Sequence, residues 1–322
     1  MARNPRTFIA RAKLWAAIAL AFLLEPIKSY ADRHLVLHLD TAFQTIYRQE
    51  YVKGFEQRMS LLRETVVTEA DIKGNTCVFL VADSGSAGAV TRGSNGRIPA
   101  RADNQTQNSC TLQEWHDLVR KTGFNVTASQ GNQRAMMQDT SMGVINRKID
   151  ETIITELNTG TVTIGTAAVT IPNVSLFQNA RVKLSNASIP WDSRITLLCQ
   201  PSFLAYLEQA PEFSNAEYVD LRPYKGSDEN PSWEDKPMVY RWRNCKIVEH
   251  PNLPGKATTS EKSFLYHKNS MGHAANTEGL VAVAGYDEEQ DYSWARTTIY
   301  MGAKLLQNSG IVVMTHDGSA YA

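Results

Sequence analysis

The residues best suited to chemistry in this chain are four acids in one short segment near the C-terminal end. Asp287, Glu288, Glu289 and Asp291 lie in the stretch GYDEEQDYSWAR. Paired carboxylates can serve as general acid and base in a hydrolase, or they can bind a cation. Charged runs of this kind are more often solvated turns. The segment therefore predicts a turn between two strands, with a hydrolase built on Asp287–Asp291 as an alternative.

Histidines offer a second set of candidates. His267 and His273 in the stretch HKNSMGH could serve the same hydrolase. His34 and His38 have the i, i+4 spacing of two metal ligands on a helix, but their segment alternates like a strand and lacks the glutamate of a zinc-protease motif. P-loop, GxSxG and strand-linked GxGxxG patterns are absent. We expect no catalytic, cofactor-binding or metal-binding residues.

Four cysteines are spread along the chain and form no metal-binding motif. Cys77, Cys110, Cys199 and Cys245 include no CxxC pair, which argues against zinc. The expected state is four reduced, mostly buried thiols. Two disulfides would require an oxidising compartment.

Composition favours a globular protein that associates with itself. The chain has 322 residues, of which 43% are hydrophobic and 20% charged, enough for one large or two smaller cores. Lysine plus arginine and aspartate plus glutamate both number 33, so the formal net charge is zero. A dedicated nucleic-acid binder usually has a basic excess. Near-zero net charge favours self-association.

The first 31 residues have the pattern of a signal peptide. Basic residues precede an apolar run at 14–24, which is too short to span a bilayer, and Ser29-Tyr30-Ala31 follows. Three interpretations remain open: an export signal, a helix that packs in an assembly, or an extension outside the fold.

Gly74–Asn132 predicts a long two-stranded excursion with a Gly/Ser-rich tip. A strand is expected at Cys77–Ala82, and glycines and serines cluster between Ser84 and Gly96. Strand-like apolar pieces follow at Leu112, Leu118, Val119, Phe124 and Val126. A lone hairpin is marginally stable in water, so this one needs a surface to lie on, which a neighbouring subunit would supply.

Helical periodicity is strongest between Gln133 and Leu157. Its apolar stripe is Met142, Ile145, Ile149, Ile153 and Leu157, and Asn158-Thr159-Gly160 ends it. A helix over 173–186 and a helix capped by Ser202 flank a buried strand at Ile195–Gln200. Thr41–Val67 predicts one or two amphipathic helices or an extended arm, and the C-terminal part is rich in strands. The fold class is α+β.

The order of these elements resembles that of a known family. The stretches MMQDTSMGVINRKIDETIITELN, ARVKLSNASIPWDSRITLLCQPSFLAYL, FLYHKNSMGHA and TTIYMGAKLLQNSGIVVM carry the likeness. They resemble the major capsid proteins of tailed bacteriophages with the HK97-like fold, in particular the coat proteins of the P22-like kind. The resemblance covers roughly residues 32–322.

The resemblance implies a division of the chain into segments. Residues 1–31 form an N-terminal extension that is signal-like or outside the fold, and 32–73 an N-terminal arm. Next come an extended E-loop (74–132), a P domain with a long spine helix (133–201) and an A domain (202–285). Residues 286–322 provide strands that return to the P domain. Because the E-loop has no lysine between Asn75 and Arg120, we do not expect it to cross-link the shell covalently.

The resemblance also implies a function and partners. The chain would be a non-enzymatic subunit of an icosahedral virion, assembling in the host cytoplasm into hexamers and pentamers around double-stranded DNA. Scaffolding and portal proteins are expected partners, DNA contacts would be non-specific, and no membrane is involved. Arg92, Arg97 and Arg101 are candidate contacts to carboxylates on another subunit. An exported β-rich binding protein is the alternative if residues 1–31 are a true signal.

Overall fold

The computed structural model describes residues 57, 59–70, 72, 74–84, 87–101, 104–128, 132–214, 219–223 and 238–321. The interpretations of residues 1–31 and of His34 and His38, and most of the predicted segment Thr41–Val67, lie outside these residues. The α-helices are α2 (Gly123–Ala128), α3 (Gln133–Leu157), α4 (Val174–Asn186), α5 (Pro201–Glu208) and α6 (Pro211–Ser214). Short 3-10 helices are η1 (Arg63–Thr65), η2 (Lys268–Ser270), η3 (Asn308–Gly310) and η4 (Ser319–Tyr321).

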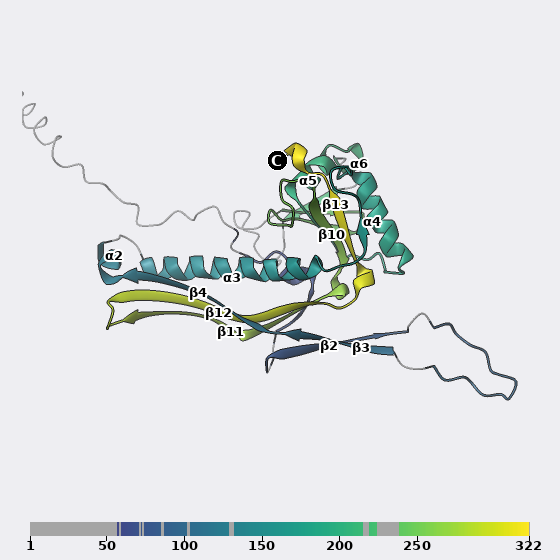
Figure 1. Cartoon of the computed structure of the whole chain (residues 1–322), viewed down its shortest axis with the longest axis horizontal. Helices are drawn as coiled ribbons and strands as arrows, with labels where there is room; N and C mark the ends of the chain where they lie inside the picture. The colour runs from purple at the N-terminus through teal and green to yellow at the C-terminus, as the bar shows by residue number, and fades with distance from the viewer. Residues whose placement is uncertain are drawn as a thin grey trace, which may run out of the picture. The chain divides into compact units, whose positions relative to one another are not determined.

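A four-stranded sheet lies along the long helix. Its order is β1 (Val67–Glu69), β11 (Met271–Asp287), β12 (Tyr292–Leu305) and β4 (Gln113–Thr122). β11 and β12 are long antiparallel partners, β4 pairs antiparallel with β12, and β1 is parallel to β11. Helix α3 runs along β12 and β4 on one face of this sheet (Figure 1).

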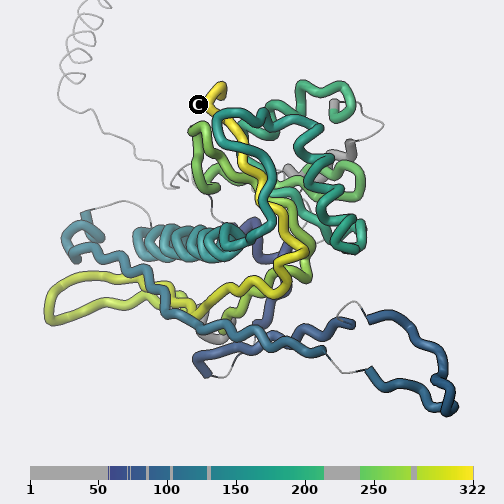
Figure 2. Tube along the Cα trace, turned by 45° about the vertical axis from the view of Figure 1, so that its right-hand side comes forward, coloured from purple at the N-terminus to yellow at the C-terminus, as the bar shows by residue number. Residues whose placement is uncertain are grey.

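A separate two-stranded ribbon leads to the Gly/Ser-rich tip. β2 (Thr76–Asp83) and β3 (Asn104–Thr111) pair antiparallel from Thr76↔Thr111 to Asp83↔Asn104. Beyond that last pair the described residues 87–101 have no regular secondary structure. The ribbon crosses the four-stranded sheet only at its base and then extends away from it (Figure 2).

A seven-stranded mixed sheet forms the other half of the described chain. Its order is β5 (Thr163–Ile164), β13 (Ile311–His316), β10 (Glu261–His267), β6 (Ile195–Cys199), β9 (Cys245–Glu249), β8 (Met238–Trp242) and β7 (Val219–Pro223). All five residues of β6 are buried, as the apolar run predicted.

No helix among the described residues is long and apolar enough to cross a membrane.

Two apolar clusters lie on opposite faces of this seven-stranded sheet. Phe264 and Tyr266 of β10 join residues of α3 and the four-stranded sheet in the first cluster. Leu265, between them, joins residues of α4, α5 and β6 in the second. Because side chains alternate along a strand, β10 and β13 contribute to both cores. The two halves of the described chain therefore share their central strands.

Helix α3 begins at a side-chain cap and buries one row of residues. The Asn132 side chain accepts the backbone N–H of Ala135 at 3.2 Å. Buried residues recur every fourth position: Met137, Ser141, Ile145, Ile149, Ile153 and Leu157. The prediction that Met142 belongs to this stripe is wrong. The buried row passes through Ser141, and 42% of Met142 is exposed.

Two local predictions are also corrected. Ser202 does not cap α5: the helix begins at Pro201 with Gln200 as N-cap, and the Ser202 hydroxyl donates to Glu261 instead. Phe124 and Val126 lie in α2 rather than in a strand. The cause in the first case is Pro201, whose fixed φ suits the first helical position.

The sheets extend across the segment boundaries expected from the sequence. β4, within the expected E-loop, forms an edge of the four-stranded sheet. β11 begins within segment 202–285 but pairs with β12, and β13 pairs with β10 rather than with strands beside α3. Ladder hydrogen bonds join strands that are distant in sequence, so the order of segments alone does not assign a strand to a sheet.

Candidate functional site

The acidic segment forms the predicted turn, and its side chains accept hydrogen bonds from the backbone of the same turn. Asp287 accepts the backbone N–H groups of Glu289 at 3.0 Å and Gln290 at 3.1 Å, at the end of β11. The hydrogen bond from Gln290 is the largest cause of the lowered pKa of Asp287. Asp291 accepts the hydroxyl of Tyr286. These carboxylates stabilise the β11–β12 turn and face solvent, an arrangement that gives no enclosed acid–base pair.

The two candidate histidines lie in different sheets. His267 ends β10, with Nε2 at 3.3 Å from Oδ1 of Asp192. His273 is fully buried in β11, where burial and the nearby Arg63 lower its pKa to about 4. Neither comes near the acidic turn at the far end of β11. Within the described part of the chain no three histidine, cysteine or acidic residues come together as metal ligands.

One constellation that the sequence did not reveal has the residue types of a hydrolase triad. Ser263 Oγ lies 2.9 Å from His316 Nε2, and His316 Nδ1 lies 3.6 Å from Glu261 Oε2. Ser263 and His316 have no exposed surface, and Glu261 is 2% exposed. Glu261 also accepts the Ala257 backbone N–H at 2.8 Å and the Ser202 hydroxyl. Since no substrate can reach a sealed serine, the cluster fastens β10 to β13 and α5.

The site with the form of an interaction surface is the base of the β2–β3 ribbon. The ribbon rests on the four-stranded sheet where two glycines replace side chains. A Cβ on Gly272 would lie 2.9 Å from the ring of Phe79, and a Cβ on Gly302 would lie 2.7 Å from Sγ of Cys110. The Asn108 side chain donates to the Leu306 carbonyl oxygen at 3.2 Å. These contacts fix the position at which the ribbon leaves the sheet.

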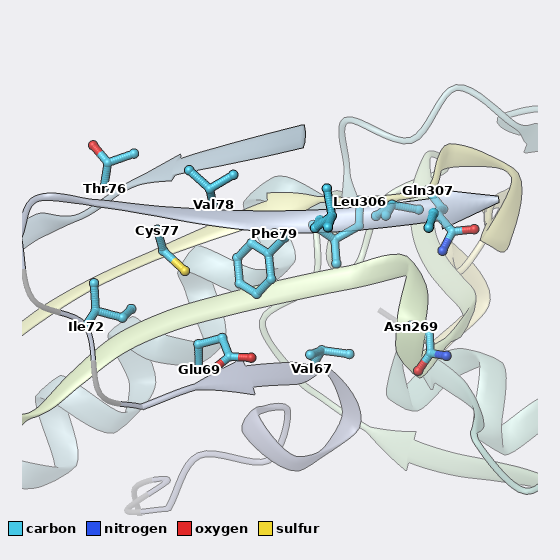
Figure 3. Close-up of a pocket in the computed structure, with 13 residues that line it drawn as sticks. Val67, Glu69, Ile72, Thr76, Cys77, Val78, Phe79, Asn269, Leu306 and Gln307 are labelled. Carbon is cyan, nitrogen blue, oxygen red and sulfur yellow. The ribbon is translucent and has the colours of Figure 1, made fainter. Parts of the chain in front are cut away.

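An open groove of about 640 Å³ runs beside this base, between β1 and β2. Cys77 and Phe79 extend from one face of β2 toward it, with Val67, Glu69 and Ile72 on the opposite side (Figure 3). Phe79, Ile72, Cys110 and Ala274 form a small apolar cluster of their own, apart from the two main cores. This small cluster therefore packs the base of the ribbon against the four-stranded sheet.

On the opposite face of β2 and in the tip, the ribbon exposes apolar side chains. Val78 and Leu80 are 55% and 59% exposed, and Val90 and Ile98 in the tip are 61% and 66% exposed. Arg92, Arg97 and Arg101 are exposed in the same tip. Arg101 makes a weak hydrogen bond at 3.5 Å to the Ser84 carbonyl oxygen. Exposed apolar and cationic side chains on an extended ribbon are typical of a surface that another protein chain covers.

One family model matches most of the chain, and solved structures share its fold. The model of the family described as phage capsid protein matches residues 39–318. No curated protein sequence matches the chain. Among solved structures, one from Mycobacterium phage Che8 has a TM-score of 0.62 at 14% identity, covering 85% of this chain and 97% of that one. The capsid of Cyanophage P-SCSP1u has a TM-score of 0.63 at 12% identity, with coverages of 85% and 92%. The capsid of Ralstonia phage GP4 has a TM-score of 0.59 at 12% identity, with coverages of 86% and 96%.

Proposed function

The chain belongs to the phage capsid protein family, and from this we propose that its β2–β3 ribbon and tip make the principal contacts to neighbouring copies in the head. Family membership makes the chain a structural, non-enzymatic subunit of a bacteriophage head, with the HK97-like fold. The hydrolase and the exported binding protein have no support from the family.

The observation that supports this proposal is the exposure of the ribbon. Residues 87–101 are exposed throughout, and the sheet that β2 and β3 form has no third strand among the described residues. A two-stranded ribbon with exposed valine, leucine and isoleucine gains stability when a second surface covers it. A neighbouring copy is the occupant that a shell of identical subunits provides.

The three arginines of the tip supply the polar part of the contact. We infer that Arg92, Arg97 and Arg101 pair with carboxylates on an adjacent subunit, because a guanidinium can bind a carboxylate through two parallel hydrogen bonds. Arg→Gln substitutions should reduce particle yield, and matched Arg→Lys substitutions separate geometry from charge. If the lysine variants assemble like the parent chain, charge alone suffices; unchanged assembly of the glutamine variants would exclude these arginines as contacts.

Strand pairing leads us to propose a division that differs from the one expected from the resemblance. We assign α3 and the four-stranded sheet to the P domain, the seven-stranded sheet with α4 and α5 to the A domain, and the β2–β3 ribbon to the E-loop. This moves β4 out of the expected E-loop and moves α4, β6 and β13 out of the expected P domain. We further propose that the subunit forms hexamers and pentamers in the host cytoplasm and is of the P22-like subtype. Its partners would be scaffolding and portal proteins, and it would contact packaged DNA non-specifically. Co-expression with the scaffolding protein of the same phage tests that partner, and the measurement is the yield of particles.

Electron microscopy and hydrogen exchange test the central proposal. Purified protein should form closed particles, and amides of residues 84–101 should exchange rapidly in the isolated subunit and slowly in the particle. A protein that stays monomeric at high concentration under all assembly conditions would count against a shell subunit. Equal exchange in subunit and particle would mean that the tip is not at the interface.

A further inference from the structure

Two of the four cysteines face each other across the β2–β3 ribbon. Cys77 and Cys110 are direct partners in the antiparallel register. Opposite residues in an antiparallel pair direct their side chains to the same face. Both belong to the apolar cluster at the ribbon base, Cys110 buried and Cys77 partly exposed, and both are free thiols here.

The hydrogen-bond pattern sets the spacing of this pair. Leu112 donates its backbone N–H to the Asn75 carbonyl oxygen at 2.8 Å, which makes Asn75 and Leu112 a hydrogen-bonded pair. Such pairs alternate with non-hydrogen-bonded ones, so Cys77 and Cys110, two residues further along both strands, are again hydrogen-bonded. The Cα atoms of such a pair are about 5.5 Å apart, within the range that disulfides occupy.

The surroundings leave one thiol accessible and hold the other in place. Cys77 lines the open groove between β1 and β2, so a small reagent can approach its sulfur (Figure 3). Cys110 lies over Gly302, where no side chain separates it from β12. At the ribbon base a partly exposed thiol therefore lies beside a buried one.

We propose that Cys77 and Cys110 form an oxidisable dithiol whose disulfide locks the base of the ribbon. The oxidant is a small-molecule disulfide of the glutathione class. The thiolate of Cys77 attacks one sulfur of that disulfide and releases one thiolate, leaving a mixed disulfide on Cys77. The thiolate of Cys110 then attacks the Cys77 sulfur and releases the second. One disulfide is consumed, one is formed, and the two protons lost by the cysteines go to the two released thiolates.

Protonation of the thiols sets the conditions for this exchange. Burial, with a contribution from Glu69, raises the pKa of Cys77, and burial raises the pKa of Cys110 to about 11. Both are protonated at neutral pH, so exchange should be slow near pH 7 and faster as pH rises. The dithiol therefore persists in a reducing environment, and in an oxidising one its conversion to the disulfide is slow near pH 7.

The other two cysteines provide an internal control. Cys199 and Cys245 are fully buried on neighbouring parallel strands, but their register partners are Glu249 and Ile195 respectively. They are four positions apart along the ladder, too far for a disulfide. Of these two pairings, only Cys77–Cys110 is therefore compatible with the strand register.

The consequence for a particle rests on the proposed function. If the ribbon joins neighbouring subunits, a bond at its base would hold β2 and β3 together while the tip is engaged. Formation of the bond itself does not depend on assembly, so it can be measured in the isolated subunit.

The experiment treats the full-length isolated subunit with oxidised glutathione at pH 8.5 and at pH 7. We expect an intramolecular disulfide between the peptides that contain Cys77 and Cys110, a mass decrease of about 2 Da for the two hydrogens lost, and reversal by dithiothreitol. The reaction should be more than tenfold faster at pH 8.5, because the thiolate fraction of a thiol rises about tenfold per pH unit below its pKa. Cys199 and Cys245 should react with a maleimide only after unfolding.

Single variants distinguish the two steps. In Cys110→Ser the glutathione adduct on Cys77 should persist, whereas Cys77→Ser should resist modification while folded. A persistent glutathione adduct on Cys77 in the parent chain, a disulfide between two subunits, or a bond involving Cys199 or Cys245 would overturn the proposal. Failure of the protein to form particles would overturn the proposed function and leave this measurement unaffected.

Discussion

At the residue scale, one buried carboxylate fixes the described segment before η1 to the long helix. Asp150 is fully buried in α3. It accepts hydrogen bonds from the Ser60 hydroxyl at 2.6 Å and from the backbone N–H groups of Leu61 at 3.0 Å and Leu62 at 3.2 Å. The Gln57 side chain also donates to it, and His250 Nε2 lies 3.6 Å away. A buried charge is tolerated when its oxygens are used in this way.

Asp150→Ala should therefore destabilise the subunit severely. Removing the carboxylate leaves several buried donors without a hydrogen-bond acceptor. We expect a loss of roughly 2–4 kcal/mol in the free energy of unfolding. Urea unfolding followed by far-UV circular dichroism measures this loss. Asp150→Asn keeps one acceptor oxygen and should lose less; equal losses in the two variants would show that the hydrogen bonds are not the cause.

Two buried histidines predict the pH dependence of stability. Burial is the largest cause that lowers the pKa of His273 and of His316 from 6.5 to about 4. The unfolded chain thus takes up protons below pH 6.5 while the folded chain does not. The contribution of each histidine is fully present above pH 6.5 and decreases as pH falls toward 4, by about 2 kcal/mol at pH 5.

Urea unfolding at pH 7.5 and pH 5 tests this expectation. His273→Gln should reduce the difference in unfolding free energy between the two pH values, even if it lowers stability at both. His116→Gln, at a position with 45% of its side chain exposed, is the matched control and should leave the difference unchanged. A parent chain equally stable at both pH values would contradict the prediction.

At the scale of elements, the ribbon depends on a close approach to the four-stranded sheet. Gly302 allows the β3 backbone to lie directly over β12, because an added Cβ would meet the Thr111 carbonyl oxygen at 2.6 Å and Sγ of Cys110 at 2.7 Å. A backbone atom cannot move aside as a flexible side chain can. The ribbon base is thus positioned by the absence of a side chain on the sheet beneath it.

Gly302→Ala should lift or loosen the ribbon base while the two main cores stay folded. We expect a destabilisation of about 1–3 kcal/mol and faster proteolytic cleavage within 76–111. Limited proteolysis with mass spectrometry locates the cuts. Gly88→Ala, at a site where an added Cβ meets nothing within 4 Å, is the control and should behave like the parent chain. Unchanged cleavage in Gly302→Ala would mean that the ribbon does not rest on β12 in solution.

At the scale of the whole described unit, the seven-stranded sheet joins two cores. Phe264 and Tyr266 face the cluster that contains Ile153 of α3, and Leu265 faces the cluster that contains Phe177 of α4. Because the same strands complete both clusters, neither should persist when the other is lost.

We therefore expect one cooperative unfolding transition. Ile153→Ala and Phe177→Ala each remove a fully buried side chain from a different cluster, and each should cost about 3–4 kcal/mol. Both should lower the midpoint of the same transition, followed by tryptophan fluorescence and by circular dichroism. Two separated transitions in either variant would show that the clusters unfold independently.

The sequence by itself determined the local elements, the fold class and the family. The turn at Asp287–Asp291, the helix 133–157 and the buried strand at 195–199 depend on periodicity and turn chemistry, which act between residues close in the chain. Only the tertiary structure decided which strands share a sheet, because ladder pairing joins residues far apart in sequence. β4, expected in the two-stranded excursion, therefore lies in the four-stranded sheet, and β13 pairs with β10. Three features depend on that register, which no local pattern encodes. They are the Ser263–His316–Glu261 cluster, the position of Gly272 and Gly302 beneath the ribbon base, and the Cys77–Cys110 pair.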